Sequence, residues 1–250
     1  MPKPKSLHRC TACGTEHRRW QGQCTGCGEW NTLAENAAPT ARTGHRPASA
    51  PVVESLNGPA RRLDRLSSGL GEFDRVLGGG FVPGSAILLG GDPGIGKSTV
   101  VLQTLAAMAA QGARCTYVSG EESVEQVRRR AERLGVLQAA IGITTATQSE
   151  AILELMHDPD APQILVVDSV QMLVSAAIDA AAGSPSQMRT CAHSLIQAAK
   201  STGVTLLLIG HVTKDSAIAG PKQIEHMVDA VLRVDQETSA QFRILRAVKN

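Results

Sequence analysis

The chain contains Gly91-Asp92-Pro93-Gly94-Ile95-Gly96-Lys97-Ser98, followed by Thr99. This run fits the pattern G-x-x-x-x-G-K-[ST] in full, with an apolar segment before it and a helical pattern after it. In that context the pattern predicts a P-loop, whose backbone N–H groups surround phosphate oxygens while the helix N-terminus adds a favourable dipole. We therefore expect an ATP site in which Lys97 bridges the phosphates and Ser98 binds Mg²⁺.

Apolar runs alternate with amphipathic segments from Arg61 onward. The expected strands are residues 86–90, 115–119, 163–168, 204–210, 230–234 and 242–248. The expected helices are residues 98–111, 123–134, 150–156 and 187–201. This alternation is typical of an α/β domain with a mostly parallel sheet and helices on both faces. The last two strands are separated by a short polar loop and should form an antiparallel hairpin at one edge of the sheet.

Polar residues at strand ends complete the predicted site. Asp168 ends an apolar strand, and an acid in that position beside a P-loop can hold Mg²⁺ through water, although a turn residue is the alternative. ATP hydrolysis also needs a carboxylate that orients water. We assign this role to Glu121 rather than Glu122, and the alternative for either is an acid at a helix N-terminus. His211 ends the next strand, where contact with the γ-phosphate and a solvent-facing loop position are both open.

Four of the six cysteines lie near the start of the chain, at Cys10, Cys13, Cys24 and Cys27. Their spacing, C-x2-C-x10-C-x2-C, lets two pairs of thiolates meet at one ion and predicts a tetrahedral zinc site. Such a site has no open coordination position, so the zinc should be structural. Two disulfides are the alternative, which a reducing cytosol disfavours.

Four further side chains of this small module have expected roles. His8 and His17 should be bystanders, because four thiolates already saturate the ion. Trp20 and Trp30 should cap the module, and base stacking is the alternative use for them.

Composition divides the chain into a zinc module (1–32), a flexible linker rich in Ala, Pro, Thr and Ser (33–60) and the α/β domain (61–250). The net charge of +2 hides an asymmetry, because residues 1–65 carry 10 basic and 5 acidic side chains. A basic arm is compatible with nucleic-acid contact and equally with a solvated segment. No apolar run is long enough to span a membrane or to form a secretory signal, so we expect a cytoplasmic protein.

These features together resemble the RadA (Sms) family of bacterial DNA-repair ATPases, whose core is RecA-like. Besides the cysteine quartet and the P-loop, the resemblance rests on Ser67-Ser68-Gly69, Leu77-Gly78-Gly79-Gly80, Tyr117-Val118-Ser119-Gly120-Glu121-Glu122-Ser123, Val167-Asp168-Ser169-Val170-Gln171 and Gly210-His211-Val212-Thr213-Lys214-Asp215. It covers nearly the whole chain.

The resemblance implies roles for individual residues. Lys97, Ser98 and Asp168 would bind ATP and Mg²⁺. Glu121 falls where RecA-like ATPases place the glutamate that activates water. Lys249 occupies the position of a basic residue that completes the nucleotide site of a neighbouring subunit.

The resemblance also implies partners and a process. The family acts in homologous recombination and DNA repair, binds single-stranded and branched DNA, and drives branch migration as a homohexameric ring. A RecA recombinase is the expected protein partner. The loops at 180–187 and 212–221 lie where such proteins contact DNA.

The sequence departs from the family pattern in two places. Ser216 stands where a glycine is expected. The chain ends at Lys249-Asn250, inside the family's K-N-R-F-G signature and before its Lon-protease-like domain, so we expect a fragment or a shortened gene. Without the signature's arginine, activation between subunits should be impaired and hydrolysis slow.

Two other functions remain open. One is a KaiC-like signalling ATPase, which shares the core but has no reason to carry a four-cysteine module. The other is an ATP- and DNA-binding fragment without effective hydrolysis. Because no aromatic residue lies between Tyr117 and Phe242, DNA should be bound through its phosphates, by Lys214, Lys222 and Arg189 together with the basic arm.

Overall fold

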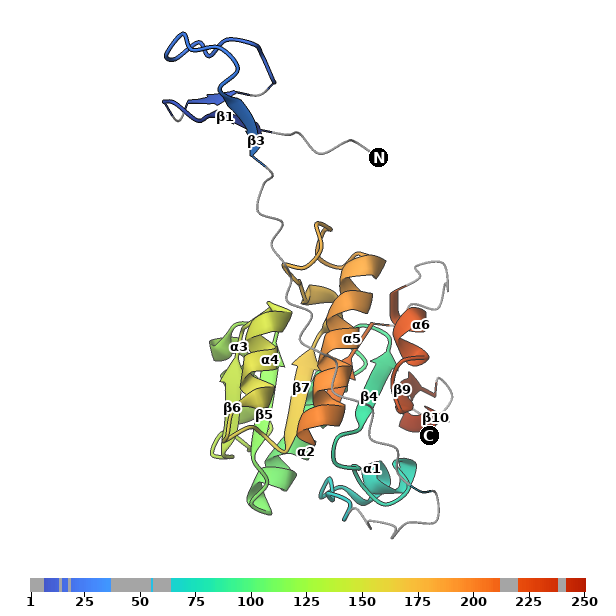
Figure 1. Cartoon of the computed structure of the whole chain (residues 1–250). Coiled ribbons are helices and arrows are strands. Elements are labelled where there is room, and N and C mark those ends of the chain that lie inside the picture. Colours follow the sequence, from blue (N-terminus) through green and yellow to red (C-terminus); the bar gives the residue numbers. More distant parts are fainter. Residues whose placement is uncertain are drawn as a thin grey trace. The chain divides into compact units, whose positions relative to one another are not determined.

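The structure is a computed structural model that describes residues 7–13, 15–17, 19–36, 55, 64–211, 220–237 and 242–250. The chain divides into two compact units, Met1–Ala60 and Arg61–Asn250 (Figure 1). Within the described ranges, no helix combines the length and the apolar character that a membrane span requires.

The first unit contains a small antiparallel sheet in the order β2-β1-β3. Its strands are β1 (Leu7–Cys10), β2 (Glu16–His17) and β3 (Leu33–Asn36). The side chain of Leu33 is buried together with Cys10 and Cys24. Because β3 pairs along the whole of β1, its residues belong to this sheet and not to the linker, which was expected to begin at residue 33. Apart from Ser55, the rest of the predicted linker lies outside the described residues.

The second unit is built on a seven-stranded sheet in the order β10-β9-β4-β8-β7-β5-β6. The strands are β4 (Ala86–Gly91), β5 (Cys115–Ser119), β6 (Ile141–Thr144), β7 (Ile164–Asp168), β8 (Thr205–Ile209), β9 (Ala230–Gln236) and β10 (Arg243–Lys249). All neighbours are parallel except β9 and β10, which form an antiparallel pair at the edge. The predicted α/β architecture and its edge hairpin are confirmed.

Helices cover both faces of this sheet (Figure 1). They are α1 (Gly71–Val76), α2 (Lys97–Ala110), α3 (Val124–Arg133), α4 (Ser149–His157), α5 (Pro185–Thr202) and α6 (Gly220–Glu225), with a short 3₁₀ turn η1 (Val170–Met172). One apolar layer contains residues of α4, α5 and α6, and the other contains residues of α1, α2 and α3.

The alternation of side chains along β4 shows how the sheet serves both layers. Leu88 is part of the layer under α4 and α5, whereas Ile87 and Leu89 are part of the layer under α2. All three are at most 1% exposed. Successive residues of a strand point to opposite faces, so a strand buried on both sides must be apolar throughout. Because these strands run parallel, their carboxyl ends all lie at one edge of the sheet. The predicted site residues come directly after those ends.

Candidate nucleotide and zinc sites

The P-loop lies between the end of β4 and the start of α2. Gly96 is the N-cap of α2 and has φ of 102°, a left-handed conformation that side-chain-bearing residues rarely adopt. No side chain caps this helix. The first N–H groups of a helix have no partner within it, so here they are available to phosphate oxygens.

Lys97 is folded into the P-loop and is 4% exposed. Its Nζ donates hydrogen bonds to the carbonyl oxygens of Gly91 (2.9 Å) and Asp92 (3.0 Å) and lies 3.3 Å from Nδ1 of His211. Burial lowers the pKa of Lys97, and nearby carboxylates, foremost Asp168, oppose that effect. The ammonium group thus lies among acceptors that phosphate oxygens can replace.

Asp168 ends β7 and is 7% exposed. Its Oδ2 accepts a hydrogen bond from the hydroxyl of Tyr117, which projects from the neighbouring strand β5. Ser98 lies in the first turn of α2, at the same edge of the sheet. A hydroxyl and a carboxylate are the hard oxygen donors that suit Mg²⁺, so the pair could hold the ion beside the phosphates. Sequence reasoning missed this contact of Tyr117, because its partner is 51 residues away.

Glu121 lies in the loop between β5 and α3. His211 lies between Glu121 and Lys97 of the P-loop and contacts both. Its Oε1 accepts hydrogen bonds from Oγ of Ser169 (2.5 Å) and from Nε2 of His211 (3.0 Å). Burial alone would raise the pKa of Glu121, but these hydrogen bonds and the charge of Lys97 lower it below its usual value. A neutral His211 fits both contacts, with Nδ1 accepting from Lys97 and Nε2 donating to Glu121.

Local hydrogen bonds between side chains and backbone hold the loop that carries Glu121 in place. The Oγ of Ser119 donates to the carbonyl oxygen of Glu122 (2.6 Å), and Ser123 caps α3 in a capping box with Gln126. A Cβ at Gly120 would lie 2.6 Å from Cβ of Met172, so only glycine fits there. Glu122 points to a different partner, because its Oε1 lies 2.5 Å from Nη2 of Arg130 in α3. This arrangement favours Glu121 for the water-orienting role, which stays a prediction.

Arg243, the first residue of β10, also reaches the P-loop. A Cβ added at Gly96 would lie 2.8 Å from Nη1 of Arg243. The guanidinium therefore adds positive charge beside the N-terminus of α2, where an anion would balance it. Sequence reasoning missed Arg243, since only the register of β10 on β9, and of β9 on β4, brings it to the loop.

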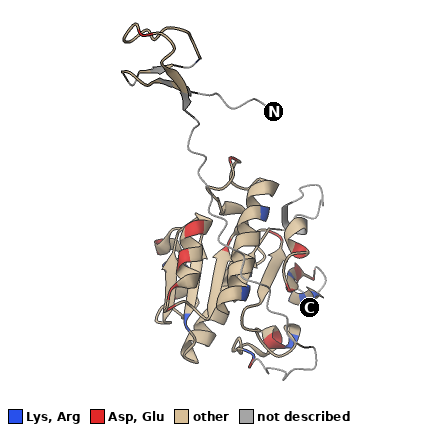
Figure 2. Ribbon diagram, viewed as in Figure 1, with Lys and Arg blue, Asp and Glu red and all other residues tan. Residues whose placement is uncertain are grey.

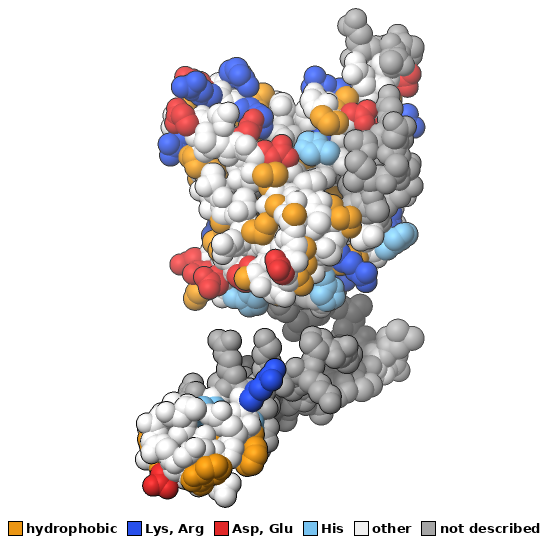
Figure 3. Space-filling model, turned by 90° about the horizontal axis from the view of Figure 1, so that it is seen from above, with side chains coloured by type: hydrophobic (Ala, Val, Ile, Leu, Met, Phe, Trp, Pro, Cys, Tyr) orange, Lys and Arg blue, Asp and Glu red, His pale blue; other side chains and the backbone are white. Residues whose placement is uncertain are grey.

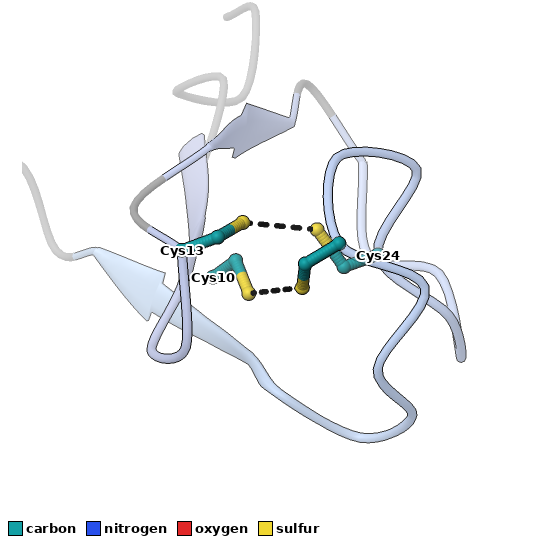
Figure 4. Close-up of side chains that lie close together, drawn as sticks. Cys10, Cys13 and Cys24 are labelled. Carbon is teal, nitrogen blue, oxygen red and sulfur yellow. Dashed lines mark hydrogen bonds between the residues drawn. The ribbon is translucent and has the colours of Figure 1, made fainter.

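The four cysteine thiols converge on one point in the first unit (Figure 4). The sulfur of Cys10 lies 3.7 Å from that of Cys27, and the sulfur of Cys13 lies 3.6 Å from that of Cys24. All four sulfurs lie within 4.8 Å of one another. Tetrahedral zinc with Zn–S bonds of about 2.3 Å requires sulfurs about 3.8 Å apart. The quartet therefore fits zinc without rearrangement.

Hydrogen bonds with Thr32 and Thr15 lower the pKa of the Cys10 and Cys13 thiols, whereas burial and the neighbouring thiols raise the pKa of Cys27. Oγ1 of Thr32 lies 3.2 Å from the sulfur of Cys10, and this hydroxyl is the main cause that lowers the pKa of Cys10 to about 6.

His17, expected to be a bystander, contacts the quartet: its Nε2 lies 3.4 Å from the sulfur of Cys24. Its Nδ1 lies 2.8 Å from Nε2 of Gln21, so Gln21 can donate to Nδ1 while Nε2 donates to the sulfur. His17 thus supports a ligand without being one.

Comparison with known proteins agrees with both sites. A family model described as an AAA domain matches residues 59–217. The chain belongs to the AAA domain family. A second model, described as a rubredoxin metal binding domain, matches residues 8–35, which contain the cysteine quartet.

Relatives of this AAA domain protein confirm its resemblance to the RadA family. Proteins named DNA repair protein RadA are 45% identical to it in Brucella abortus, 43% in Bacillus subtilis and 42% in Escherichia coli. The alignments cover 99–100% of this chain but 55–56% of each relative, so the chain spans about half the length of the curated relatives it matches. A solved structure of an ATPase domain is similar with a TM-score of 0.64 and 16% identity, over 76% of this chain and 84% of that one. That likeness shows the fold alone.

Lys249 does not reach the P-loop of its own AAA domain. Its partner in the sheet is Val231, near the start of β9, whereas Gly91 of the P-loop pairs with Val234 further along that strand. The Nζ of Lys249 donates to the carbonyl oxygen of Val228 (2.6 Å), at the opposite end of the sheet. Lys249 therefore cannot bind nucleotide within its own chain in this arrangement, and its role in a neighbouring subunit stays a prediction.

The two tryptophans of the zinc module are exposed, which corrects the expectation that they cap it. Trp20 is 60% exposed and Trp30 is 66% exposed. Hydrophobic side chains are visible on the surface of this module in Figure 3. Cys10, Cys24 and Leu33, rather than the indoles, form the buried centre of the module.

The predicted DNA loops are described only in part. Residues 212–219, with Lys214 and Ser216, lie outside the described residues, as does the side chain of Lys222. In the other loop, Gln187 is 3% exposed and its Nε2 donates to the carbonyl oxygen of Ala180 (3.0 Å), so this residue closes the loop. Arg189 is exposed near the start of α5. In the ribbon of Figure 2, the described Lys and Arg positions of the second unit are spread over several elements.

Proposed function

We propose that this protein is a DNA-dependent ATPase of homologous recombination and DNA repair that binds single-stranded DNA and promotes branch migration of recombination intermediates. The observation that carries the proposal is the connected set of Lys97, His211 and Glu121 at the mouth of a P-loop, beside the buried Asp168. The names of the RadA relatives supply the biological process.

The site geometry supports in-line attack of water on the γ-phosphorus of ATP. Glu121, a carboxylate whose pKa lies below its usual value, would accept a proton from the water and orient the oxygen. The new P–O bond forms as the bond to the ADP oxygen breaks. Lys97 and the N–H groups at the start of α2 would stabilise the charge on the transferred group. Mg²⁺, held by Ser98 and Asp168, would neutralise charge on the β- and γ-phosphates.

His211 would link the nucleotide to DNA. It contacts both Lys97 and Glu121, and the predicted DNA loop starts at the next residue. A γ-phosphate that binds Lys97 would change the partners of His211. Because the predicted DNA loop follows His211 directly in the sequence, His211 would pass a change at the γ-phosphate to residues that bind DNA.

The DNA contacts would be electrostatic. Arg189 and the basic N-terminal unit would bind backbone phosphates, with weak dependence on base sequence. A homohexameric ring would place several such surfaces along one strand, and Lys249 would then reach the nucleotide site of a neighbouring subunit. A RecA recombinase would supply the strand-exchange intermediates on which branch migration acts.

The test is steady-state phosphate release with and without single-stranded DNA, for the wild-type chain, Glu121→Gln and Glu122→Gln. We expect a slow basal rate that DNA raises modestly in the wild type and in Glu122→Gln, and we expect Glu121→Gln to be inactive while it still binds ATP. A wild-type rate that DNA leaves unchanged would instead favour a signalling ATPase.

A further inference from the structure

Tyr117 is the only tyrosine of the chain, and it lies in the middle of β5, between strands β7 and β6 of the sheet. It is 1% exposed and belongs to the apolar layer under α2 and α3. A buried phenol hydroxyl needs a hydrogen-bond partner, and here it donates to Oδ2 of Asp168. The ring therefore crosses the apolar core, and its hydroxyl reaches the carboxylate of Asp168 at the nucleotide site.

The register of β5 on β7 explains why the two side chains meet. Tyr117 pairs with Val166, which is two residues before Asp168. Residues two apart on a strand share a face, so Tyr117 and Asp168 project from the same side of adjacent strands. A long aromatic side chain spans the offset, whereas an aliphatic residue would leave Oδ2 without this donor.

We propose that Tyr117 is a positioning residue for Mg²⁺ at the nucleotide site. Its hydroxyl holds Oδ2 of Asp168, which fixes the carboxylate rotamer and leaves Oδ1 for the metal or its water. This inference rests on the proposed ATPase function. Donors that orient a metal-binding carboxylate raise metal affinity, and their loss costs roughly tenfold or more.

A purely structural role would give a different result. In that case the ring would fill the core and the hydroxyl would only satisfy its own hydrogen bond. Tyr117→Phe keeps the ring and removes the hydroxyl, so it separates the two roles. Thr104→Val is the matched control, because Thr104 is a fully buried hydroxyl in α2 whose partner is the carbonyl oxygen of Val100.

The first experiment measures ADP affinity by calorimetry over a series of Mg²⁺ concentrations and in EDTA. For Tyr117→Phe we expect the Mg²⁺ concentration that gives half of the full change in ADP affinity to rise roughly tenfold. The ADP affinity in EDTA should be unchanged. Thr104→Val should match the wild type. Equal Mg²⁺ dependence of Tyr117→Phe and the wild type would overturn the inference. If the ADP affinity of the wild type does not depend on Mg²⁺, the proposed ATPase site is wrong and this inference fails with it.

The second experiment needs no substitution in the reporter residue. Because the chain has one tyrosine, ¹³C at tyrosine Cζ gives a single NMR resonance. We expect this resonance to move when Mg²⁺ is added to the ADP complex, with the same half-point as the calorimetric effect, and to be displaced in Asp168→Asn. A resonance that stays in place throughout the Mg²⁺ titration would show that the hydroxyl does not sense the metal.

Discussion

Lys97 and Glu121 illustrate what single residues contribute to this site and how far sequence predicts them. The motif was enough to place Lys97 at the P-loop, because its spacing from the glycines is local. The contacts of Glu121 with Ser169 and His211 join residues 48 and 90 positions apart. No local pattern contains them, and only the pairing of the central strands brings them together.

Lys97→Ala should abolish tight nucleotide binding. The substitution removes the cation that phosphate oxygens would meet, and a hydrogen bond to a charged group contributes about 1.5–3 kcal/mol. Affinity for ATP, measured by calorimetry, should fall at least about tenfold. Lys200→Ala is the control, because Lys200, on α5, is a half-exposed partner of Asp229. Retained affinity in Lys97→Ala would place the phosphates elsewhere.

Glu121→Gln and Glu122→Gln should differ in turnover. The amide that Glu121→Gln introduces cannot accept the proton of water, so hydrolysis should slow about 10²-fold or more while ATP still binds. Glu122 contacts Arg130 instead, so its amide variant should turn over ATP normally. Single-turnover hydrolysis of radiolabelled ATP measures both. The reverse order would mean that Glu122 orients the water.

Whole elements were predictable where their hydrophobic pattern is regular, either as an apolar run or as an amphipathic helix. The strand expected at 115–119 has those bounds in the structure, and α2, α3 and α5 lie close to theirs. The sequence did not reveal β6, which has 4 residues, or α1, which has 6. Elements this short are stabilised by packing on the sheet. They contain too few residues to show a recognisable hydrophobic pattern in the sequence.

The edge strand β10 gives a prediction of its own. Arg243→Ala should weaken ADP binding roughly tenfold, because the guanidinium beside Gly96 would pair with phosphate or ribose oxygens. Arg246→Ala on the same strand is the control, since Arg246 lies 3.9 Å from Asp235. Calorimetry at fixed ionic strength compares the two. Equal affinities would show that Arg243 does not contact the nucleotide.

The whole molecule combines a unit with a cysteine quartet and a unit with a P-loop, so damage to one should spare the other. The wild-type chain should contain about one zinc by elemental analysis. Cys24→Ser should lose the metal but keep ATP affinity. Cys115→Ala is the control: burial raises the pKa of Cys115 to about 11, and this thiol belongs to the core of the second unit. A wild-type chain without zinc and with oxidised cysteines would refute the metal site.

The distribution of charge over the whole molecule favours contacts with phosphates at its N-terminal end. The basic side chains of residues 1–65 and the exposed Arg189 suit phosphate contacts. Such contacts release counterions, so both DNA affinity and any effect of DNA on the ATPase should weaken as salt increases.

The most direct test of the account is the rate of phosphate release by the wild-type chain, with and without single-stranded DNA, over increasing NaCl concentration. We predict a slow rate without DNA and a modest increase with DNA of unrelated base sequences at low salt. This stimulation should fall steeply with salt, while the rate without DNA changes little. Identical rates with and without DNA at low salt would contradict the claim that this site couples ATP hydrolysis to DNA.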